Sequence, residues 1–243
     1  DEEARGFWHK FYTLWLGEFF YRNTIDPTGL AQFSSSSDQQ YSCHDLILSE
    51  RAIVPVWGGK DSIVTIEQVR ESGIPMDLFT FGKDNPIYQD TTDIVWQRRL
   101  IVTRILSESL FAMNREWYPN GHIPITGVIS FVLMLVAYLY DYHYVVLSNE
   151  YSANFGNLDF QGIKVNHQYS KSLEFENDFR KYVKNYMTPD IEYFSMMRPY
   201  YEVSIIAQFA KYRQYYSVFT SCNANFKIAW GKLIGSRWCK NCP

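Results

Sequence analysis

The stretch VPVWGGKDSIVTIE, residues 54–67, joins a β-branched apolar run to a helix-like pattern through two glycines, a lysine, an aspartate and a serine. Glycine lets the backbone approach a ligand closely, and the first N–H groups of a helix point toward a bound anion. We therefore expect this glycine loop, residues 57–62, to hold a phosphate group. The alternative is a turn that only packs a helix tightly against a strand.

Strand-like and helix-like stretches alternate on both sides of the loop, from about residue 51 to residue 149. Apolar runs predict strands at residues 51–56, 76–82 and 144–150, and helical periodicity predicts helices at residues 62–72, 92–113 and 125–140. This order is typical of an α/β domain with a mostly parallel sheet flanked by helices. A further amphipathic helix is predicted near residues 170–187.

Three segments are predicted along the chain. Residues 1–50 form an aromatic-rich packing segment, in which Phe7, Phe11, Leu14 and Trp15 recur at helical spacing and residues 34–38 look like a flexible connector. Residues 51–165 form the nucleotide-binding core. Residues 166–243 form a helical extension that binds substrate and carries three of the four cysteines.

Composition limits the partners and the compartment. The 23 basic and 26 acidic side chains give a formal charge of −3, so we expect no nucleic-acid partner. Residues 123–140 carry no charge, but Pro124 and Gly127 open this run and no Lys or Arg cluster follows it, so we expect a core helix rather than a membrane span. We see no secretory signal and expect a cytoplasmic protein.

The GGKDS string resembles the pyrophosphate loop of the PP-loop ATP pyrophosphatases, usually written SGGxDS. The resemblance implies that Gly58, Gly59, Lys60 and the Ser62 hydroxyl bind the pyrophosphate of ATP, and that Asp61 helps to hold Mg²⁺. Trp57 departs from the pattern, because a serine usually stands at that position. The classical GxxxxGK[ST] and GxGxxG phosphate motifs are absent.

Polar residues follow the predicted strand at residues 144–150, in the strings LSNEYSANFGN (147–157) and VNHQYSKSLEFE (165–176). Ligands of α/β sheets bind at the carboxyl ends of the strands, so we expect these strings to border a site. With GGKDS and WCKNCP (238–243), they resemble the UDP-N-acetylmuramoyl-L-alanyl-L-glutamate epimerase family of peptidoglycan precursor synthesis. The resemblance covers residues from about 51 to the C-terminus.

This resemblance implies an enzyme that inverts the terminal L-glutamate of a UDP-muramoyl dipeptide while ATP becomes AMP and pyrophosphate. Adenylation makes the Cα–H more acidic, and inversion then needs groups that exchange protons near neutral pH. His167 is the leading candidate, with Tyr169 and Lys171 as partners, although His167 would equally suit a hydrogen-bonding role. The remaining predicted contacts are Ser148, Asn149 and Glu150 for ATP, and Asn154, Asn166, Gln168 and Ser170 for the substrate.

Two other function classes stay open at this point. One is another adenylating PP-loop enzyme that forms amides, modifies nucleobases or transfers sulfur. The other is a nucleotide-binding module without catalysis.

The cysteines indicate thiols in a reducing compartment. Cys239 and Cys242 have the two-residue spacing of a zinc site, and Cys222 lies sixteen residues before Cys239, which predicts three ligands of a structural Zn²⁺. Cys43 is expected to be a buried apolar residue.

Overall fold

A computed structural model of the 243-residue chain describes all residues except 31, 35–42, 122–124, 222–227, 230–231 and 234–243. The chain divides into two compact units. Unit 1 comprises Asp1–Ser49, Ile105–His143 and Ser152–Tyr193, and unit 2 comprises Glu50–Arg104, Tyr144–Tyr151 and Phe194–Pro243. A unit limit lies between Ser49 and Glu50, next to the boundary predicted near residue 50, whereas residue 165 lies inside unit 1. Each unit draws on distant parts of the chain.

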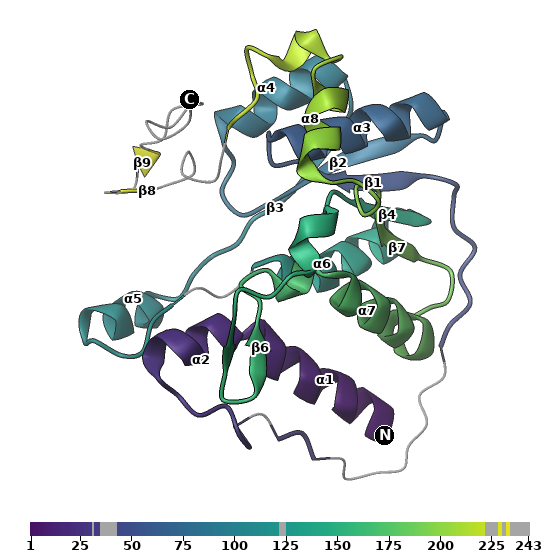
Figure 1. Cartoon of the computed structure of the whole chain (residues 1–243). Helices are drawn as coiled ribbons and strands as arrows, with labels where there is room; N and C mark the ends of the chain where they lie inside the picture. Colours follow the sequence, from purple (N-terminus) through teal and green to yellow (C-terminus); the bar gives the residue numbers. More distant parts are fainter. Residues whose placement is uncertain (31, 35–42, 122–124, 222–227, 230–231, 234–243) are drawn as a thin grey trace. The chain divides into compact units, whose positions relative to one another are not determined.

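A five-stranded sheet has the strand order β3-β2-β1-β4-β7 (Figure 1). The strands are β1 Ala52–Pro55, β2 Met76–Phe81, β3 Arg99–Val102, β4 Tyr144–Leu147 and β7 Glu192–Ser195. The strand β1 is parallel to both neighbours, with Ala52 opposite Met76 on one side and Tyr144 on the other. The carboxyl ends of β1, β2 and β4 therefore meet at one edge of the sheet. The predicted α/β fold with a parallel sheet and flanking helices is confirmed.

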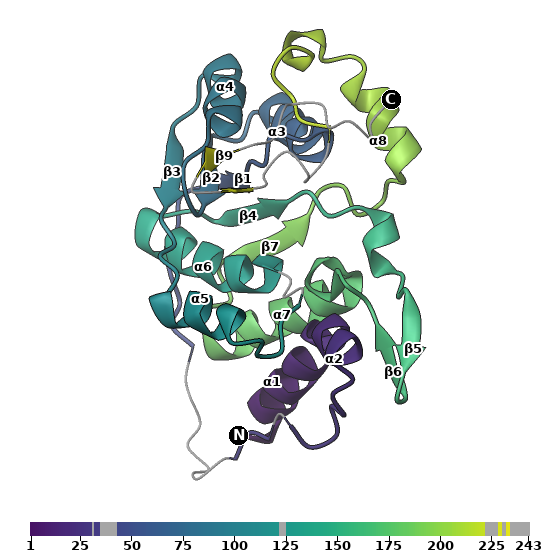
Figure 2. The ribbon, with the colours of Figure 1, turned by 90° about the vertical axis from the view of Figure 1, so that its left-hand side faces the viewer.

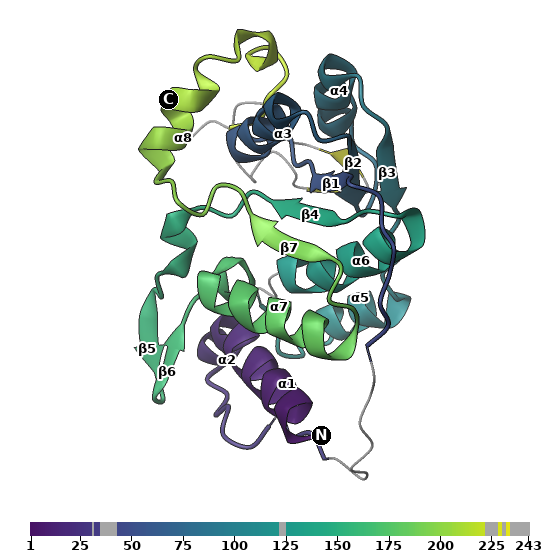
Figure 3. The same cartoon turned by 90° about the vertical axis from the view of Figure 1, so that its right-hand side faces the viewer.

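Three helices of unit 2 lie on the same side of this sheet (Figures 2 and 3). They are α3 Lys60–Ser72, α4 Pro86–Val95 and α8 Glu202–Phe209. The helices α3 and α4 each connect parallel strands, and right-handed crossovers in one direction along a sheet place both helices on one face. Side chains of β1, β2, α3 and α8 form the apolar core of unit 2.

Unit 1 is mostly helical. Its helices are α1 Glu2–Trp15, α2 Gly17–Asn23, α5 Glu108–Arg115, α6 Ile125–Tyr140 and α7 Leu173–Tyr186, and its hairpin consists of β5 Leu158–Phe160 and β6 Ile163–Val165. Short 3₁₀ helices are η1 Tyr151–Asn154, η2 Tyr169–Lys171 and η3 Arg213–Tyr215, of which η3 belongs to unit 2. In unit 2, the strands β8 Ile228–Ala229 and β9 Lys232–Leu233 form a small antiparallel pair. Among the N-terminal aromatics, Phe11 and Trp15 are buried.

The prediction of one helix over residues 92–113 is wrong. The helix α4 ends at Val95, where Trp96 takes a left-handed conformation with φ +58°, and the chain then forms β3 before α5 begins. The run RLIV pairs with β2, from Leu78 opposite Arg99 to Phe81 opposite Val102. Short apolar runs fit a helix and a strand equally well by periodicity, so the pairing with β2 decides between them.

The apolar helix α6 is buried on one face only. Gly127, Ile129 and Leu133 are among its buried residues, whereas Leu135 and Leu139 are 54% and 61% exposed. The expected core helix is therefore buried along one face and exposed along another. Within the described residues, no helix combines the length and the hydropathy that crossing a bilayer requires.

Candidate functional site

The glycine loop follows β1 directly and leads into α3. Gly58 has φ +72°, and a Cβ there would lie 2.4 Å from the Cγ2 atom of Ile87. Both facts require glycine at this position. The Gly58 carbonyl accepts a hydrogen bond of 2.7 Å from the Thr220 N–H, which ties the loop to a segment far along the chain.

The amino end of α3 is open to an acceptor from outside. Its N-cap residue is Gly59, and no side chain of the described residues caps it. By contrast, α4 is capped by Asn85 and α7 by Ser172. Uncapped N–H groups carry the positive end of the helix dipole, so this end of α3 can bind an anion.

Two charged side chains of the loop contact each other. The Lys60 Nζ atom lies 2.8 Å from Asp61 Oδ1 and 3.1 Å from Oε1 of Glu202, the first residue of α8. Burial lowers the pKa of Lys60, but the two carboxylates outweigh this effect and raise it overall. Lys60 therefore stays cationic at neutral pH.

Ser62 contributes to the shape of the loop. Its hydroxyl is buried, donates to the Gly59 carbonyl at 2.9 Å and accepts from the Trp57 N–H at 3.4 Å. Trp57, which stands where the related loops have serine, packs edge-to-face on Tyr88 with ring centroids 6.1 Å apart. The hydroxyl predicted to bind phosphate is thus hydrogen-bonded within the loop.

The end of β4 lies beside the glycine loop, because β1 and β4 are parallel neighbours. Here the Ser148 hydroxyl is buried and has no hydrogen-bond partner among the described residues. The Asn149 amide donates to Ser195 Oγ at 3.0 Å, and the Glu150 carbonyl accepts from Arg198 Nη1 at 3.0 Å. An unsatisfied buried hydroxyl at this edge fits a site that is completed by a ligand.

A carboxylate of the loop has the chemistry of a Mg²⁺ ligand in a nucleotide complex. Asp61 offers this carboxylate, and Mg²⁺ usually takes one or two carboxylates together with phosphate oxygens and water. In the part of the chain that the structure describes, no group of three or more His, Cys, Asp or Glu side chains forms a complete metal cage. The predicted zinc ligands Cys222, Cys239 and Cys242 lie outside the described residues.

The second predicted cluster, residues 166–171, belongs to unit 1 and is called the His167 segment below. His167 Nδ1 lies 2.6 Å from Asn157 Oδ1, and its Nε2 lies 3.0 Å from the Gln168 amide nitrogen. Each ring nitrogen of His167 therefore has one side-chain amide as its partner.

Other polar residues near the His167 segment stabilise local turns. The Asn166 side chain donates to the Ala153 carbonyl at 2.9 Å and accepts from the Gln168 N–H, and Asn154 Oδ1 accepts from the Leu173 N–H at 2.6 Å. These contacts join the strings 147–157 and 165–176, which the sequence separates.

Three residues complete the His167 segment. Burial, followed by the Glu174 and Asp178 carboxylates, strongly raises the pKa of Tyr169, which therefore remains a neutral phenol. The Ser170 hydroxyl is buried and lacks a hydrogen-bond partner among the described residues. Lys171 is the last residue of η2 and is half-buried.

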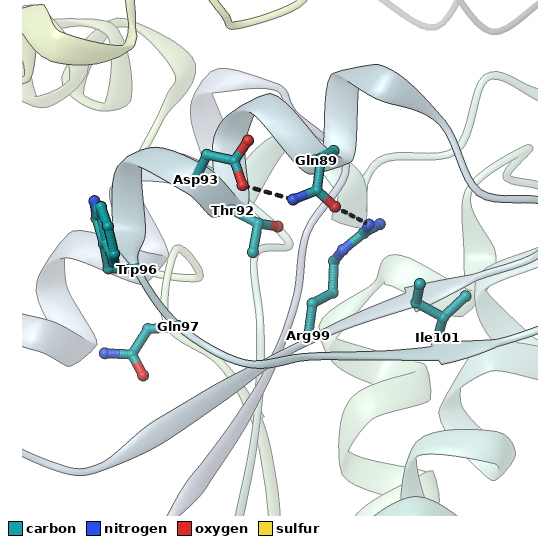
Figure 4. A pocket seen from close by; sticks show the side chains of 7 residues that line it. All are labelled: Gln89, Thr92, Asp93, Trp96, Gln97, Arg99 and Ile101. Carbon is teal, nitrogen blue, oxygen red and sulfur yellow. Dashed lines mark hydrogen bonds between the residues drawn. The ribbon is translucent and has the colours of Figure 1, made fainter.

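A hollow of about 540 Å³ lies elsewhere in unit 2, beside the last turn of α4 and the start of β3 (Figure 4). Trp96, Gln97 and Arg99 are among its lining residues. Because Arg99 is the first residue of β3, this hollow is at the amino end of the strand, whereas the glycine loop follows the carboxyl end of β1. The hollow therefore does not belong to the predicted phosphate site.

Sequence reasoning missed Glu202, Thr220, Ser195 and Arg198, which contact the loop or the end of β4. Ser195 is the last residue of β7, and α/β sheets hold ligands at that end of their strands, but the sequence pattern did not predict β7. Cys43 was expected to be buried, but it is only half-buried, with its thiol donating to the Lys184 carbonyl.

Comparisons with known proteins give the chain relatives along its whole length. It is 37% identical over 243 residues to a UDP-N-acetyl-alpha-D-muramoyl-L-alanyl-L-glutamate epimerase from Xanthomonas oryzae pv. oryzae, covering 100% of this chain and 53% of the relative. Proteins of the same name from Micromonospora sp. and Salinispora tropica are 34% and 32% identical, each covering 96% of this chain and 51% and 50% of the relative. The chain thus spans about half the length of these relatives.

Solved structures resemble the chain less closely. A predicted tRNA methyltransferase subunit from Methanocaldococcus jannaschii has a TM-score of 0.42 at 16% identity, covering 66% of this chain and 75% of its own. The NMN synthetase from Francisella tularensis has a TM-score of 0.39 at 11% identity, covering 68% and 61%. Both scores are too low to support an argument about the site.

A family model, the MurL N-terminal domain, matches residues 1–196. This match covers most of the chain and agrees with the family resemblance found in GGKDS and the two polar strings. The chain therefore belongs to the MurL N-terminal domain family.

Proposed function

We propose that this chain takes part in the ATP-dependent inversion of the terminal L-glutamate of UDP-N-acetylmuramoyl-L-alanyl-L-glutamate, in the cytoplasm. The observation that carries the proposal is the identity of 32–37% over nearly the whole chain to epimerases of that name. Since those relatives are about twice as long, the activity of the whole enzyme is part of the proposal.

The glycine loop is the proposed binding site of the outer phosphates of ATP. The uncapped amino end of α3, the cationic Lys60 and the unsatisfied hydroxyl of Ser148 support this assignment. Asp61 would hold Mg²⁺, which supplies charge neutralisation to the phosphates. Asn149 and Glu150 would contact the rest of the nucleotide.

The proposed reaction consists of adenylation, inversion at Cα and hydrolysis. A glutamate carboxylate oxygen attacks the α-phosphorus of ATP, which breaks the bond to pyrophosphate and forms an acyl-adenylate. A base removes the Cα proton, an acid returns a proton to the opposite face, and water hydrolyses the adenylate to AMP and the D-glutamate product. His167 is the proposed proton carrier, and the neutral Tyr169 suits a donor. Lys171 is a further candidate, with Asn154, Asn166, Gln168 and Ser170 as proposed substrate contacts.

Two measurements test the two halves of the reaction separately. Exchange of labelled pyrophosphate into ATP that depends on the muramoyl dipeptide reports adenylation alone. Incubation with ATP, Mg²⁺ and dipeptide in deuterated water should also yield D-glutamate with deuterium at Cα. Exchange without deuterium would indicate a different adenylating enzyme, and binding of ATP with neither result would indicate a nucleotide-binding module.

A further inference from the structure

The Lys60 ammonium group is held by two carboxylates rather than by one. Its Nζ atom contacts Asp61 within the glycine loop and Glu202 from α8, and the Lys60 side chain is only 22% exposed. Of the two acidic side chains, Asp61 is adjacent to Lys60 in the sequence. Glu202 comes from a helix about 140 residues later in the chain and needs a separate explanation.

The position of Glu202 follows from the packing of α8. Ile205 and Phe209 of this helix are buried in the core of unit 2. The Gln208 carboxamide oxygen accepts a hydrogen bond of 2.5 Å from Gln68 of α3. Because Lys60 is the first residue of α3 and Glu202 is the first residue of α8, two helices that pack together hold this ion pair in place.

The charges of the contact oppose the binding of a polyphosphate. One ammonium faces two carboxylates, so these three side chains carry a net charge of −1 beside the uncapped end of α3. A phosphate oxygen that binds Lys60 must replace at least one carboxylate. Asp61 has a proposed role with Mg²⁺, whereas Glu202 is 60% exposed and can turn toward solvent.

We propose that Glu202 is a positioning residue that competes with the outer phosphates of ATP for Lys60. This inference rests on the proposed function and deepens it. Glu202 holds Lys60 before the nucleotide arrives, and after adenylation it takes Lys60 back, which weakens the retention of pyrophosphate. The expected consequence is that removal of the Glu202 charge strengthens phosphate binding.

The experiment is calorimetric titration of the 243-residue chain with pyrophosphate and with ATP, each in Mg²⁺. The variant Glu202→Gln should bind pyrophosphate about 3- to 5-fold more tightly, which is the size expected for a partly exposed charge pair. Glu71→Gln is the matched control, because it removes the same charge from α3 at a site where the carboxylate contacts Tyr212 instead. This control should change the affinity by less than about 2-fold.

A double-mutant cycle separates the contact from a general charge effect. In a Lys60→Met background, Glu202→Gln should change pyrophosphate affinity by less than about 2-fold. Equal or weaker binding by Glu202→Gln, or the same tightening without Lys60, would overturn the inference while leaving the proposed function intact. If the wild-type chain binds neither pyrophosphate nor ATP, the proposed function fails, and this inference fails with it. Thermal unfolding of every variant verifies that the fold is retained.

Discussion

The glycine loop and the His167 segment are both rich in polar side chains, but they use these groups differently. In the glycine loop, no described side chain caps the amino end of α3, and the hydroxyl of the nearby Ser148 has no hydrogen-bond partner among those residues. In the His167 segment, both imidazole nitrogens already have amide partners, and Asn166 is committed to local turns.

This difference indicates where the binding of a ligand adds the most hydrogen bonds. Backbone N–H groups without an acceptor gain a hydrogen bond when an anion arrives, whereas a hydrogen-bonded imidazole must first exchange one partner. We therefore expect the glycine loop to bind its ligand on its own. The His167 segment should act only when a substrate replaces the Gln168 or Asn157 contact.

The largest expected effect comes from the acidic residue of the loop. Asp61→Ala should lower pyrophosphate–ATP exchange about 100- to 1,000-fold, a loss typical of one electrostatic group at a reacting phosphate. The fold should survive, because the Asp61 side chain is 38% exposed. Asp93→Ala, an exposed carboxylate on α4, is the control and should leave exchange unchanged. Substantial exchange by Asp61→Ala would show that the metal role is misassigned.

A smaller and selective effect is expected at the second cluster. His167→Ala should lower deuterium incorporation at Cα about 100-fold, within the range for loss of a general acid or base, while pyrophosphate exchange continues. The exposed His9 provides a matched histidine control. If both reactions fell together in His167→Ala, the residue would serve adenylation or folding rather than proton transfer, and the contrast between the clusters would disappear.

The loop backbone offers a stability test. Gly58→Ala should lower the free energy of unfolding by about 2–4 kcal/mol, because it combines a left-handed φ with a clash against Ile87. Gly59→Ala is the matched control, since a Cβ there would lie 3.9 Å from the Thr220 carbonyl oxygen, an ordinary contact distance, and φ is −91°. The control should cost less than about 1 kcal/mol. Urea unfolding of both variants measures the difference, and equal losses would contradict the geometry.

The smallest effect concerns pH. Burial lowers the pKa of Lys60, but the neighbouring carboxylates raise it overall. Lys60 is therefore charged at every pH below this raised pKa and loses its charge only as the pH rises through it. ATP affinity should therefore stay nearly constant from about pH 8 to pH 10. Titration calorimetry across this range measures it, with Lys60→Arg as a control that cannot deprotonate. A fall in wild-type affinity that is absent from Lys60→Arg would show early loss of the Lys60 proton.

Sequence patterns predicted three elements of the fold well. The strand β1, the helix α3 and the helix α6 appear within two residues of their predicted limits, because strong periodicity and glycine signals are local. The segment after α4 was predicted wrongly, because α4 ends at Trp96, where no glycine or proline signals the end of a helix. The strand β7 has only four residues, and nothing in so short a run distinguishes it from a loop.

The sequence by itself determined the local chemistry of this protein: the glycines that open α3, the adjacent Lys60 and Asp61, and the polar strings that carry the family resemblance. These features depend on neighbours within a few residues, and local propensities act at that range. Tertiary structure alone decided that Glu202 reaches Lys60 and that Thr220 holds Gly58. Such contacts depend on how helices pack against a sheet over more than 100 residues, which no local pattern encodes.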